Sequence, residues 1–257
     1  SDMDVRTLLH GYNLIRWDGE QGLYTADESV VSGFVATEDD DGNHAYIIAL
    51  YDDLKYSDGT SITAWDYAFS ILLSIAPEIA ELDGTPKDMQ YLLGYQDYVS
   101  GVRNYLAGVN VLSDTQLLIT LNHEFLPYFY EVGLLSCVPY PISVIAPGVK
   151  VADDGLGVYL TNMDASVEEP AFSVELLEET LLDPDEGYLS HPSVVSGPYT
   201  LDSFDGEIAQ FSRNPYYKGD YLGNVPSIQK ITFTTGNDAS LISQLADGSL
   251  DLVNKVT

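Results

Sequence analysis

The chain has 257 residues, of which 40 are acidic and 10 are basic, so its formal net charge is −30. A chain of this length can bury a sizeable core, and a hydrophobic content of 45% excludes an intrinsically disordered protein. The charge repels phosphate backbones and anionic lipid headgroups, which excludes nucleic acid as a partner and electrostatic docking on a membrane. The longest apolar stretch, residues 67–76, is far shorter than the ~20 residues of a membrane span.

The first elements in chain order are an amphipathic, helix-like segment and a β-hairpin. Alternating apolar residues at 30–36 and 44–50 flank an acidic turn that contains an Asp-Gly pair. Asp-Gly favours tight turns because glycine accepts positive φ and the aspartate side chain bonds to nearby backbone. The pattern therefore predicts two antiparallel strands.

A buried helix is predicted next. Thr63 and Asp66 have the spacing of a capping box, in which a hydroxyl and a carboxylate pair with free amides at a helix start. Residues 67–76 are apolar on nearly every side, so this helix should be buried until Pro77 ends it.

Three further elements follow in the second half of the chain. Residues 172–182 carry one apolar stripe opposite a glutamate-rich face, which predicts a helix. Residues 199–204 and 208–212 alternate around the pair Asp205-Gly206 and predict a second hairpin.

The last elements predict a crossover between parallel strands. Residues 228–234 form a strand pattern, followed by a short apolar helix that Asn237 or Asp238 caps and Gly248 ends. Residues 250–253 are predicted to begin another strand, which makes a βαβ unit in a parallel sheet. Because that strand would need partners, we expect the chain to be a truncated piece.

The candidates for catalysis or metal binding are weak. Cys137 lies in an apolar run and is interpreted as a core residue rather than a nucleophile. His123 begins a zinc-protease pattern, but Pro127 stands where the second histidine is needed. Residues 37–43 and 183–187 are rich in carboxylates yet lack calcium-loop spacing, so solvated turns are favoured. We predict no catalytic residue, no metal site and no cofactor.

Tyrosine content favours a binding protein over an enzyme. The chain has 19 tyrosines and two tryptophans. Tyrosine supplies rigid apolar area with a polar tip, which suits recognition surfaces and the wet edges of cores. A single tyrosine is more often a core or rim residue, so only the total carries this inference.

Several segments resemble the family 5 extracellular solute-binding proteins of ABC transporters, the oligopeptide, dipeptide and nickel binders. Residues 46–70 contain Lys-Tyr-Ser-Asp-Gly-Thr-Ser-Ile-Thr-Ala-Trp-Asp, which is similar to the family's strand-turn-helix signature. Residues 196–201 (Ser-Gly-Pro-Tyr-Thr-Leu), 213–219 (Arg-Asn-Pro-Tyr-Tyr-Lys-Gly), 226–233 and 245–252 follow in the family's order. These motifs build turns and strand entries, so they are expected to be scaffold rather than ligand contacts.

The resemblance implies the fold class and the domain organisation. It implies an α/β, periplasmic-binding-protein-like lobe with a mixed sheet and an inserted smaller α+β domain, the second lobe being absent. Residues 1–36 and 188–257 would form lobe I, and residues 37–187 the inserted domain. In this family two lobes close on a ligand by hinge motion.

The function implied is the substrate-binding component of an ABC importer that captures peptides. Its partners would be a peptide or another small solute and the transporter's permease subunits. It would work in the periplasm or on the outer face of a bacterial membrane, as a secreted or lipid-anchored protein, and would reach the membrane only through an anchor that this chain lacks.

The predicted ligand contacts are Tyr12, Asn13, Ser196 and Gly197, with simple turn residues as the alternative reading. Two rival functions stay open. One is a secreted carbohydrate-active hydrolase or binder that uses paired carboxylates. The other is a purely structural interaction domain.

Overall fold

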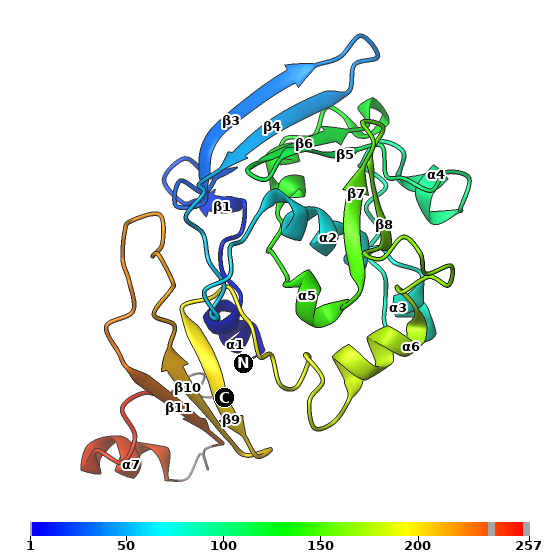
Figure 1. Cartoon of the computed structure of the whole chain (residues 1–257). Coiled ribbons are helices and arrows are strands. Elements are labelled where there is room, and N and C mark those ends of the chain that lie inside the picture. The colour runs from blue at the N-terminus through cyan, green and yellow to red at the C-terminus, as the bar shows by residue number, and fades with distance from the viewer. Residues whose placement is uncertain (1, 236–239, 254–257) are drawn as a thin grey trace.

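Two packed bodies make up the fold, which comes from a computed structural model describing residues 2–235 and 240–253. The larger body is built around a core that draws its buried side chains from residues 12–188. The smaller body holds α1, β9, β10, β11 and α7, and its core consists of Leu9, Val195, Tyr199 and Phe211. In Figure 1 the smaller body lies at the lower left, apart from the sheet that carries β3 and β4.

The main sheet of the larger body has four antiparallel strands in the order β3-β4-β6-β5. The first hairpin is confirmed: β3 (Val31–Glu38) pairs with β4 (His44–Leu50), and Glu38 lies opposite His44 beside the turn. The other two strands are β6 (Gln116–Leu121) and β5 (Val109–Ser113). Alternation along β4 buries Tyr46, Ile48 and Leu50 against the core.

The predicted buried helix is α2 (Ala64–Ser74), and it ends before Pro77 as expected. The Asp66 carboxylate accepts hydrogen bonds from the Thr63 amide at 2.8 Å and the Thr63 hydroxyl at 3.2 Å, which confirms the capping role. Tyr67 and Phe69 are fully buried. Burying a large aromatic side chain stabilises the fold by about 2–3 kcal/mol, so this helix anchors the larger body.

Short elements complete the larger body. They are β1 (Ile15–Asp18), β2 (Leu23–Ala26), α3 (Glu78–Glu81), α4 (Tyr95–Val99), η1 (His123–Phe125), η2 (Glu131–Leu135), α5 (Ile142–Ile145), β7 (Val149–Asp153) and β8 (Val158–Asn162). β1 pairs with β2, and β7 pairs with β8, in each case antiparallel.

The helix predicted over residues 172–182 is confirmed as two consecutive helical segments. They are α6 (Val174–Leu177) and η3 (Glu178–Leu182), where the winding loosens. The Ser173 hydroxyl caps the start by accepting the Leu176 amide at 3.2 Å.

The smaller body is an antiparallel sheet in the order β11-β10-β9, with α1 (Asp2–Leu9) packed against β9. The second predicted hairpin is confirmed as β9 (Tyr199–Phe204) and β10 (Ile208–Arg213). The third strand is β11 (Lys230–Thr234), followed by α7 (Leu241–Asp247).

The predicted parallel crossover is wrong for the described residues. Residues 250–253 form no strand, Leu252 is 80% exposed, and each strand pairing among residues 2–235 and 240–253 is antiparallel. The apolar pattern there gives a strand propensity, but a strand also needs a neighbour to accept its backbone hydrogen bonds. Gly248 ends α7 in a left-handed conformation as predicted, whereas Asn237 and Asp238 lie outside the described residues.

The predicted domain boundaries at residues 36 and 187 stay a prediction. Packing places Leu14, Val30 and Val31 in the same core as α2. The helix α1 and the strands β9 and β10 share the other core. Within the described ranges no helix is long and apolar enough to cross a membrane.

The buried Asp66 carboxyl predicts a pH-dependent stability. Burial raises its pKa to about 6, although the hydrogen bonds from Thr63 oppose that shift. The folded chain therefore keeps this proton to a higher pH than the unfolded chain does, so the stabilisation present at low pH is lost as pH rises toward 6. We expect the unfolding free energy of the wild type, relative to Asp66→Asn, to fall by about 2 kcal/mol between pH 4 and pH 7.

Urea unfolding at pH 4, 5, 6 and 7 measures this difference. The matched control is Asp52→Asn, which makes the same substitution at an exposed position, and the pH-dependent change for Asp66→Asn should exceed the change for this control. A change for Asp66→Asn no larger than that of the control would show that the Asp66 carboxyl titrates normally.

Candidate functional site

The two bodies meet at a junction, defined by residues 10–14 between α1 and β1 and by residues 196–197 before β9. Gly11 and Ser196, 185 positions apart, bond to each other in both directions. The Gly11 amide donates to the Ser196 hydroxyl at 3.0 Å, and this hydroxyl donates to the Gly11 carbonyl at 3.1 Å. The Ser196 side chain is 1% exposed, so it serves the junction and faces no solvent.

Gly197 allows the closest backbone approach at the junction. Its amide donates to the Leu9 carbonyl at 2.8 Å, and its carbonyl accepts the Asn214 side-chain amide at 2.9 Å. A Cβ added to Gly197 would lie 2.4 Å from the Leu8 carbonyl oxygen. Only glycine fits between these two segments without a backbone shift.

Tyr12 links the junction to both bodies. Its ring is 4% exposed and stacks on Tyr217 with 5.3 Å between the ring centroids. Its hydroxyl accepts the Lys218 amide at 2.7 Å, and its carbonyl accepts the Tyr67 hydroxyl at 2.6 Å. Burial raises the pKa of Tyr12, so the phenol stays neutral at physiological pH. Its φ of 57° is a left-handed conformation that these contacts hold in place.

Asn13 ties the junction to the segment after η2. Its side-chain nitrogen donates to the Ser136 hydroxyl at 2.8 Å. Its side-chain oxygen accepts the amides of Ile15 and Cys137, each at 3.1 Å. Both ends of the Asn13 amide are therefore used within the chain.

The structure thus brings all four predicted ligand residues together at one place. Their main polar groups bond within the chain, and Tyr12, Ser196 and Gly197 are buried. A role in direct ligand contact stays a prediction.

His10 is a junction residue that sequence reasoning missed. Its ring lies 5.1 Å from Tyr140 and 6.3 Å from Tyr188, measured between centroids. Burial, with a smaller contribution from nearby Arg6, lowers the pKa of His10 to about 4, so the ring is neutral at physiological pH. Its Nδ1 is buried and has no hydrogen-bond partner among residues 2–235 and 240–253. A single histidine at the end of a helix pattern gives no signal that could have identified this environment.

Lysine and arginine side chains covering tyrosine rings form a second set of contacts at this boundary. Lys218 lies 3.9 Å above the Tyr51 ring and pairs with Asp53 at 2.7 Å. Lys55 lies 5.9 Å above the Tyr216 ring. Since Tyr51, Asp53 and Lys55 belong to the larger body, these contacts attach the loop after β10 to it.

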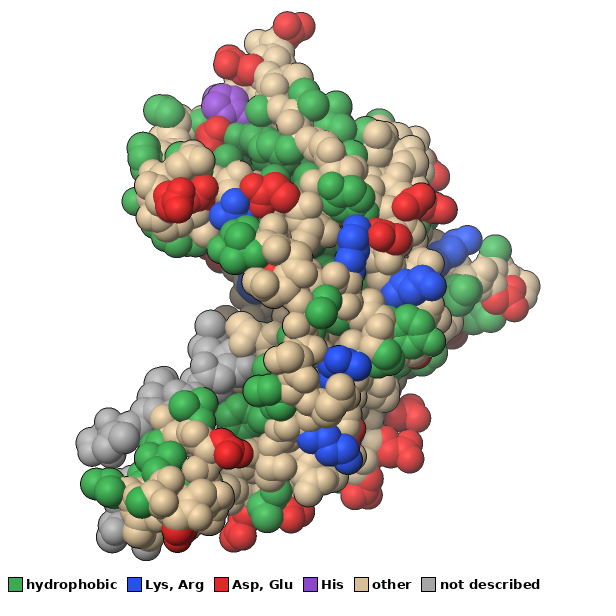
Figure 2. Space-filling view, turned by 90° about the vertical axis from the view of Figure 1, so that its left-hand side faces the viewer, with side chains coloured by type: hydrophobic (Ala, Val, Ile, Leu, Met, Phe, Trp, Pro, Cys, Tyr) green, Lys and Arg blue, Asp and Glu red, His purple; other side chains and the backbone are tan. Residues whose placement is uncertain are grey.

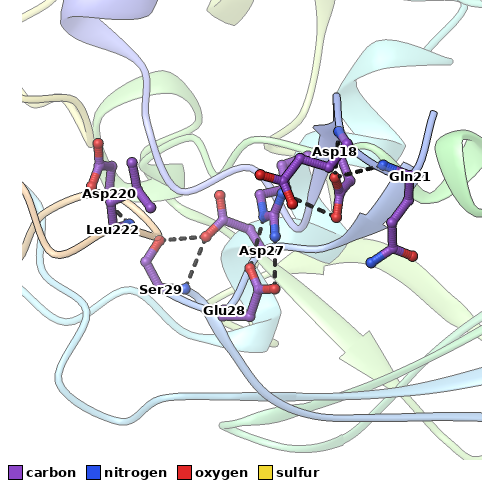
Figure 3. Close-up of polar contacts among 9 residues, drawn as sticks. Asp18, Gln21, Asp27, Glu28, Ser29, Asp220 and Leu222 are labelled. Carbon is purple, nitrogen blue, oxygen red and sulfur yellow. Dashed lines mark hydrogen bonds and ion pairs between the residues drawn. The ribbon is translucent and has the colours of Figure 1, made fainter. Parts of the chain in front are cut away.

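Arg16 makes the matching contact from β1. Its guanidinium binds both Glu28 oxygens, at 2.7 and 2.8 Å, and lies 4.1 Å above the Tyr221 ring. The Arg16 hydrogen bonds lower the pKa of the Glu28 carboxyl. Figure 3 shows this carboxylate close to Asp18 and Asp27, near the loop that carries Asp220 and Leu222. In Figure 2 the basic side chains lie along the middle of the face shown.

The predicted weak candidates occupy structural positions. Burial raises the pKa of the Cys137 thiol to about 12, and Cys137 packs against the main core, which confirms the interpretation as a core residue. The amide of His123 donates to the Asn43 side chain at 2.9 Å. The carboxylates of Asp39 and Asp183 accept backbone amides within their own turns.

No group of three or more His, Cys, Asp or Glu side chains is arranged to hold a metal ion within residues 2–235 and 240–253. Two open hollows, of about 390 and 380 Å³, lie away from the junction. One is lined by the acidic face of α6 and η3, and the other by β8 and the segment after it.

Comparison with known proteins identifies the class of protein to which this fold belongs. The profile of the bacterial extracellular solute-binding proteins, family 5 Middle, matches residues 29–257. The chain therefore belongs to this family, which confirms the predicted resemblance.

Curated relatives and solved structures agree with the family. The probable D,D-dipeptide-binding periplasmic protein DdpA of Escherichia coli is 24% identical over 92% of this chain, and the oligopeptide-binding protein OppA of Lactococcus lactis subsp. lactis is 22% identical over 92%. This chain spans 35% of the length of each.

The solved structures confirm the periplasmic-binding-protein-like fold class. Listeria monocytogenes OppA bound to peptide has a TM-score of 0.62 at 16% identity, over 95% of this chain and 40% of that one. A periplasmic oligopeptide-binding protein from Borrelia burgdorferi has a TM-score of 0.61 at 21% identity, over 96% and 41% of the two chains.

Replacing Gly197 by alanine should loosen the junction. Because the new Cβ would collide with the backbone of Leu8 and Leu9, we expect Gly197→Ala to lower the unfolding free energy by about 3 kcal/mol. Urea unfolding measures this. The control is Gly19→Ala, where a Cβ meets nothing within 4 Å, and its effect should stay within about 0.5 kcal/mol. Equal effects of the two substitutions would contradict the close approach.

Removing the Tyr12 hydroxyl tests the other junction contact. Tyr12→Phe leaves the Lys218 amide without its acceptor, so we expect a loss of about 1–2 kcal/mol in thermal or urea unfolding. Tyr24→Phe is the matched control, since its ring is 38% exposed and its hydroxyl makes no hydrogen bond among the described contacts. A loss for Tyr12→Phe no larger than for Tyr24→Phe would speak against the bond.

Proposed function

We propose that this chain is part of the substrate-capturing component of an ABC importer that takes up peptides outside the bacterial cell. The observation that carries the proposal is the family match over residues 29–257. The relatives support it, because they include dipeptide- and oligopeptide-binding proteins of the periplasm. The Haemophilus influenzae OppA structure, solved with RPPGFSPFR, supports peptides as the solute class.

A binding role without catalysis is part of the proposal. The acid with a raised pKa, Asp66, is 8% exposed and serves to cap α2. The raised pKa of the Cys137 thiol removes its nucleophilic character at neutral pH. The alternative of a carbohydrate-active hydrolase gains no support from the family match.

For the junction we propose a role in holding the ligand-binding wall. Tyr12, Ser196 and Gly197 would fix the backbone between the two bodies, while Asn13 and the exposed Ser136 lie nearer to solvent. In this proposal residues 1–36 and 188–257 act as one lobe and residues 37–187 as an insertion. Permease subunits are the proposed protein partners.

Isothermal titration calorimetry of the protein in its full natural length tests the solute class. We expect saturable heat with mixed peptides of two to nine residues. In a separate thermal unfolding experiment, peptide at 100 times its Kd should raise the unfolding free energy of the protein by about 2.7 kcal/mol. A nickel complex and a neutral oligosaccharide serve as controls and should give no saturable heat. Binding of either control without binding of peptide would refute the assignment.

A further inference from the structure

Five aromatic side chains form one exposed cluster on the larger body, which we call the aromatic surface: Trp17, Tyr24, Tyr128, Phe129 and Tyr130. Their exposed fractions are 49%, 38%, 46%, 80% and 38%, in that order. They come from β1, from β2 and from the segment before η2. Large exposed aromatic areas are uncommon on soluble proteins unless something binds them.

The rings contact one another in a defined arrangement. Trp17 and Tyr24 lie opposite each other in the β1–β2 pair, edge to face, with centroids 5.0 Å apart. Tyr130 reaches across to both, at 6.0 and 5.9 Å. Phe129 and Tyr128 extend the cluster from Tyr130, at 4.8 and 6.3 Å. Edge-to-face pairs of this kind hold the rings in place before any ligand arrives.

Gly133 helps to hold the aromatic surface together. A Cβ at this position would lie 2.7 Å from the ring of Tyr24, so a larger residue would push that ring away. The absence of a side chain at Gly133 lets η2 pack closely against β2.

The polar tips of the aromatic surface are free within the described residues. The hydroxyls of Tyr24, Tyr128 and Tyr130 and the Trp17 indole nitrogen take part in no hydrogen bond there, whereas the backbone carbonyls of Tyr128 and Tyr130 accept the amides of Glu131 and Gly133. By contrast, the hydroxyls of Tyr67 and Tyr188 each donate to a backbone carbonyl, at 2.6 Å in both cases. Free hydroxyls on rigid rings are typical of recognition surfaces.

Among the described residues no lysine or arginine side chain lies over the rings of the aromatic surface. The four cation–ring contacts among the described residues involve the rings of Tyr51, Tyr105, Tyr216 and Tyr221. Arg16, which precedes Trp17, lies over the Tyr221 ring instead. Two acidic residues follow rings of the surface in sequence: Asp18, which lies 4.0 Å from Arg16, and Glu131, which accepts the Tyr46 hydroxyl. In a chain of net charge −30, these ring faces lie in a field that attracts positive groups and repels anionic ones.

We propose that the aromatic surface binds a peptide segment bearing lysine or arginine side chains. The cationic group would lie on the ring faces by cation–π attraction, and the free tyrosine hydroxyls would accept its N–H donors. The charge argument excludes an anionic lipid or a nucleic acid as occupant. This inference names a surface other than the junction, and it holds whether or not the protein serves a peptide importer.

Fluorescence of Trp17 tests the proposal. In a Trp65→Phe background Trp17 is the remaining tryptophan, and circular dichroism checks that the fold is kept. Trp65 donates its indole N–H to Asp114, so its replacement removes one exposed contact away from the aromatic surface. We expect the Trp17 fluorescence to change saturably with tri-arginine and with tri-lysine, and the affinity for both to fall as the salt concentration is raised. Tri-glutamate and a neutral oligosaccharide should leave the fluorescence unchanged.

Matched variants identify the surface. Phe129→Ala should weaken tri-arginine binding about 10-fold, and Tyr130→Phe, which keeps the ring, about 3-fold. The control Phe204→Ala makes the same substitution at an exposed phenylalanine, 51% exposed, at the far end of β9 and should leave the affinity unchanged.

Four results would overturn the proposal. They are equal binding of tri-glutamate, an equal loss of affinity in Phe204→Ala, a response to the oligosaccharide alone, and self-association that Phe129→Ala abolishes in sedimentation velocity. Calorimetry with neutral peptides tests the importer role separately. Tri-arginine binding that depends on Phe129 therefore supports the aromatic surface even if neutral peptides fail to bind.

Discussion

The reciprocal hydrogen bonds between Gly11 and Ser196 are the contact on which the arrangement of the two bodies depends. They join positions 185 residues apart, and the bond from Gly197 to the Leu9 carbonyl runs beside them. Because Gly11 lies on one segment of this contact and Gly197 on the other, the two backbones approach more closely than a side chain at either position would allow. The stacking of Tyr12 on Tyr217 and the Lys218 contacts with Tyr51 and Asp53 join the loop after β10 to the same region.

Tyrosine side chains occupy three kinds of environment in this protein, which differ in burial and in what contacts the ring or the hydroxyl. Tyr12, Tyr67 and Tyr188 are buried, with hydroxyls bonded inside the chain. A second set, Tyr51, Tyr216 and Tyr221, is covered by lysine or arginine and attaches the loop after β10 to the larger body. The third set, Tyr24, Tyr128 and Tyr130, is exposed, and its hydroxyls make no hydrogen bond within the part of the chain that the structure describes. The high tyrosine content therefore points to binding only through the third set.

Much of the fold was predictable from local sequence patterns, whereas the strand predicted at residues 250–253 failed because strand formation depends on a partner elsewhere in the chain. Both hairpins and the start of α2 follow from alternation, Asp-Gly turns and the Thr63–Asp66 spacing, each of which acts within a few residues. Residues 250–253 have an equally good strand pattern, yet no strand forms among the described residues. Pairing depends on a neighbour that the local sequence does not reveal. His10 escaped prediction for the same reason, because its ring neighbours Tyr140 and Tyr188 lie far along the chain.

Motif order, periodicity and charge are properties of the linear chain, and they were enough to predict the family, the hairpins β3–β4 and β9–β10, the capped helix α2 and the strongly acidic character. The contacts of Tyr12, Asn13, Ser196 and Gly197 could be found only in the folded chain, since their main partners lie far along the sequence. The tertiary structure also decided which aromatic rings are left exposed together. Burial and hydrogen bonding depend on which residues lie close together in space, and this is established only when the chain folds.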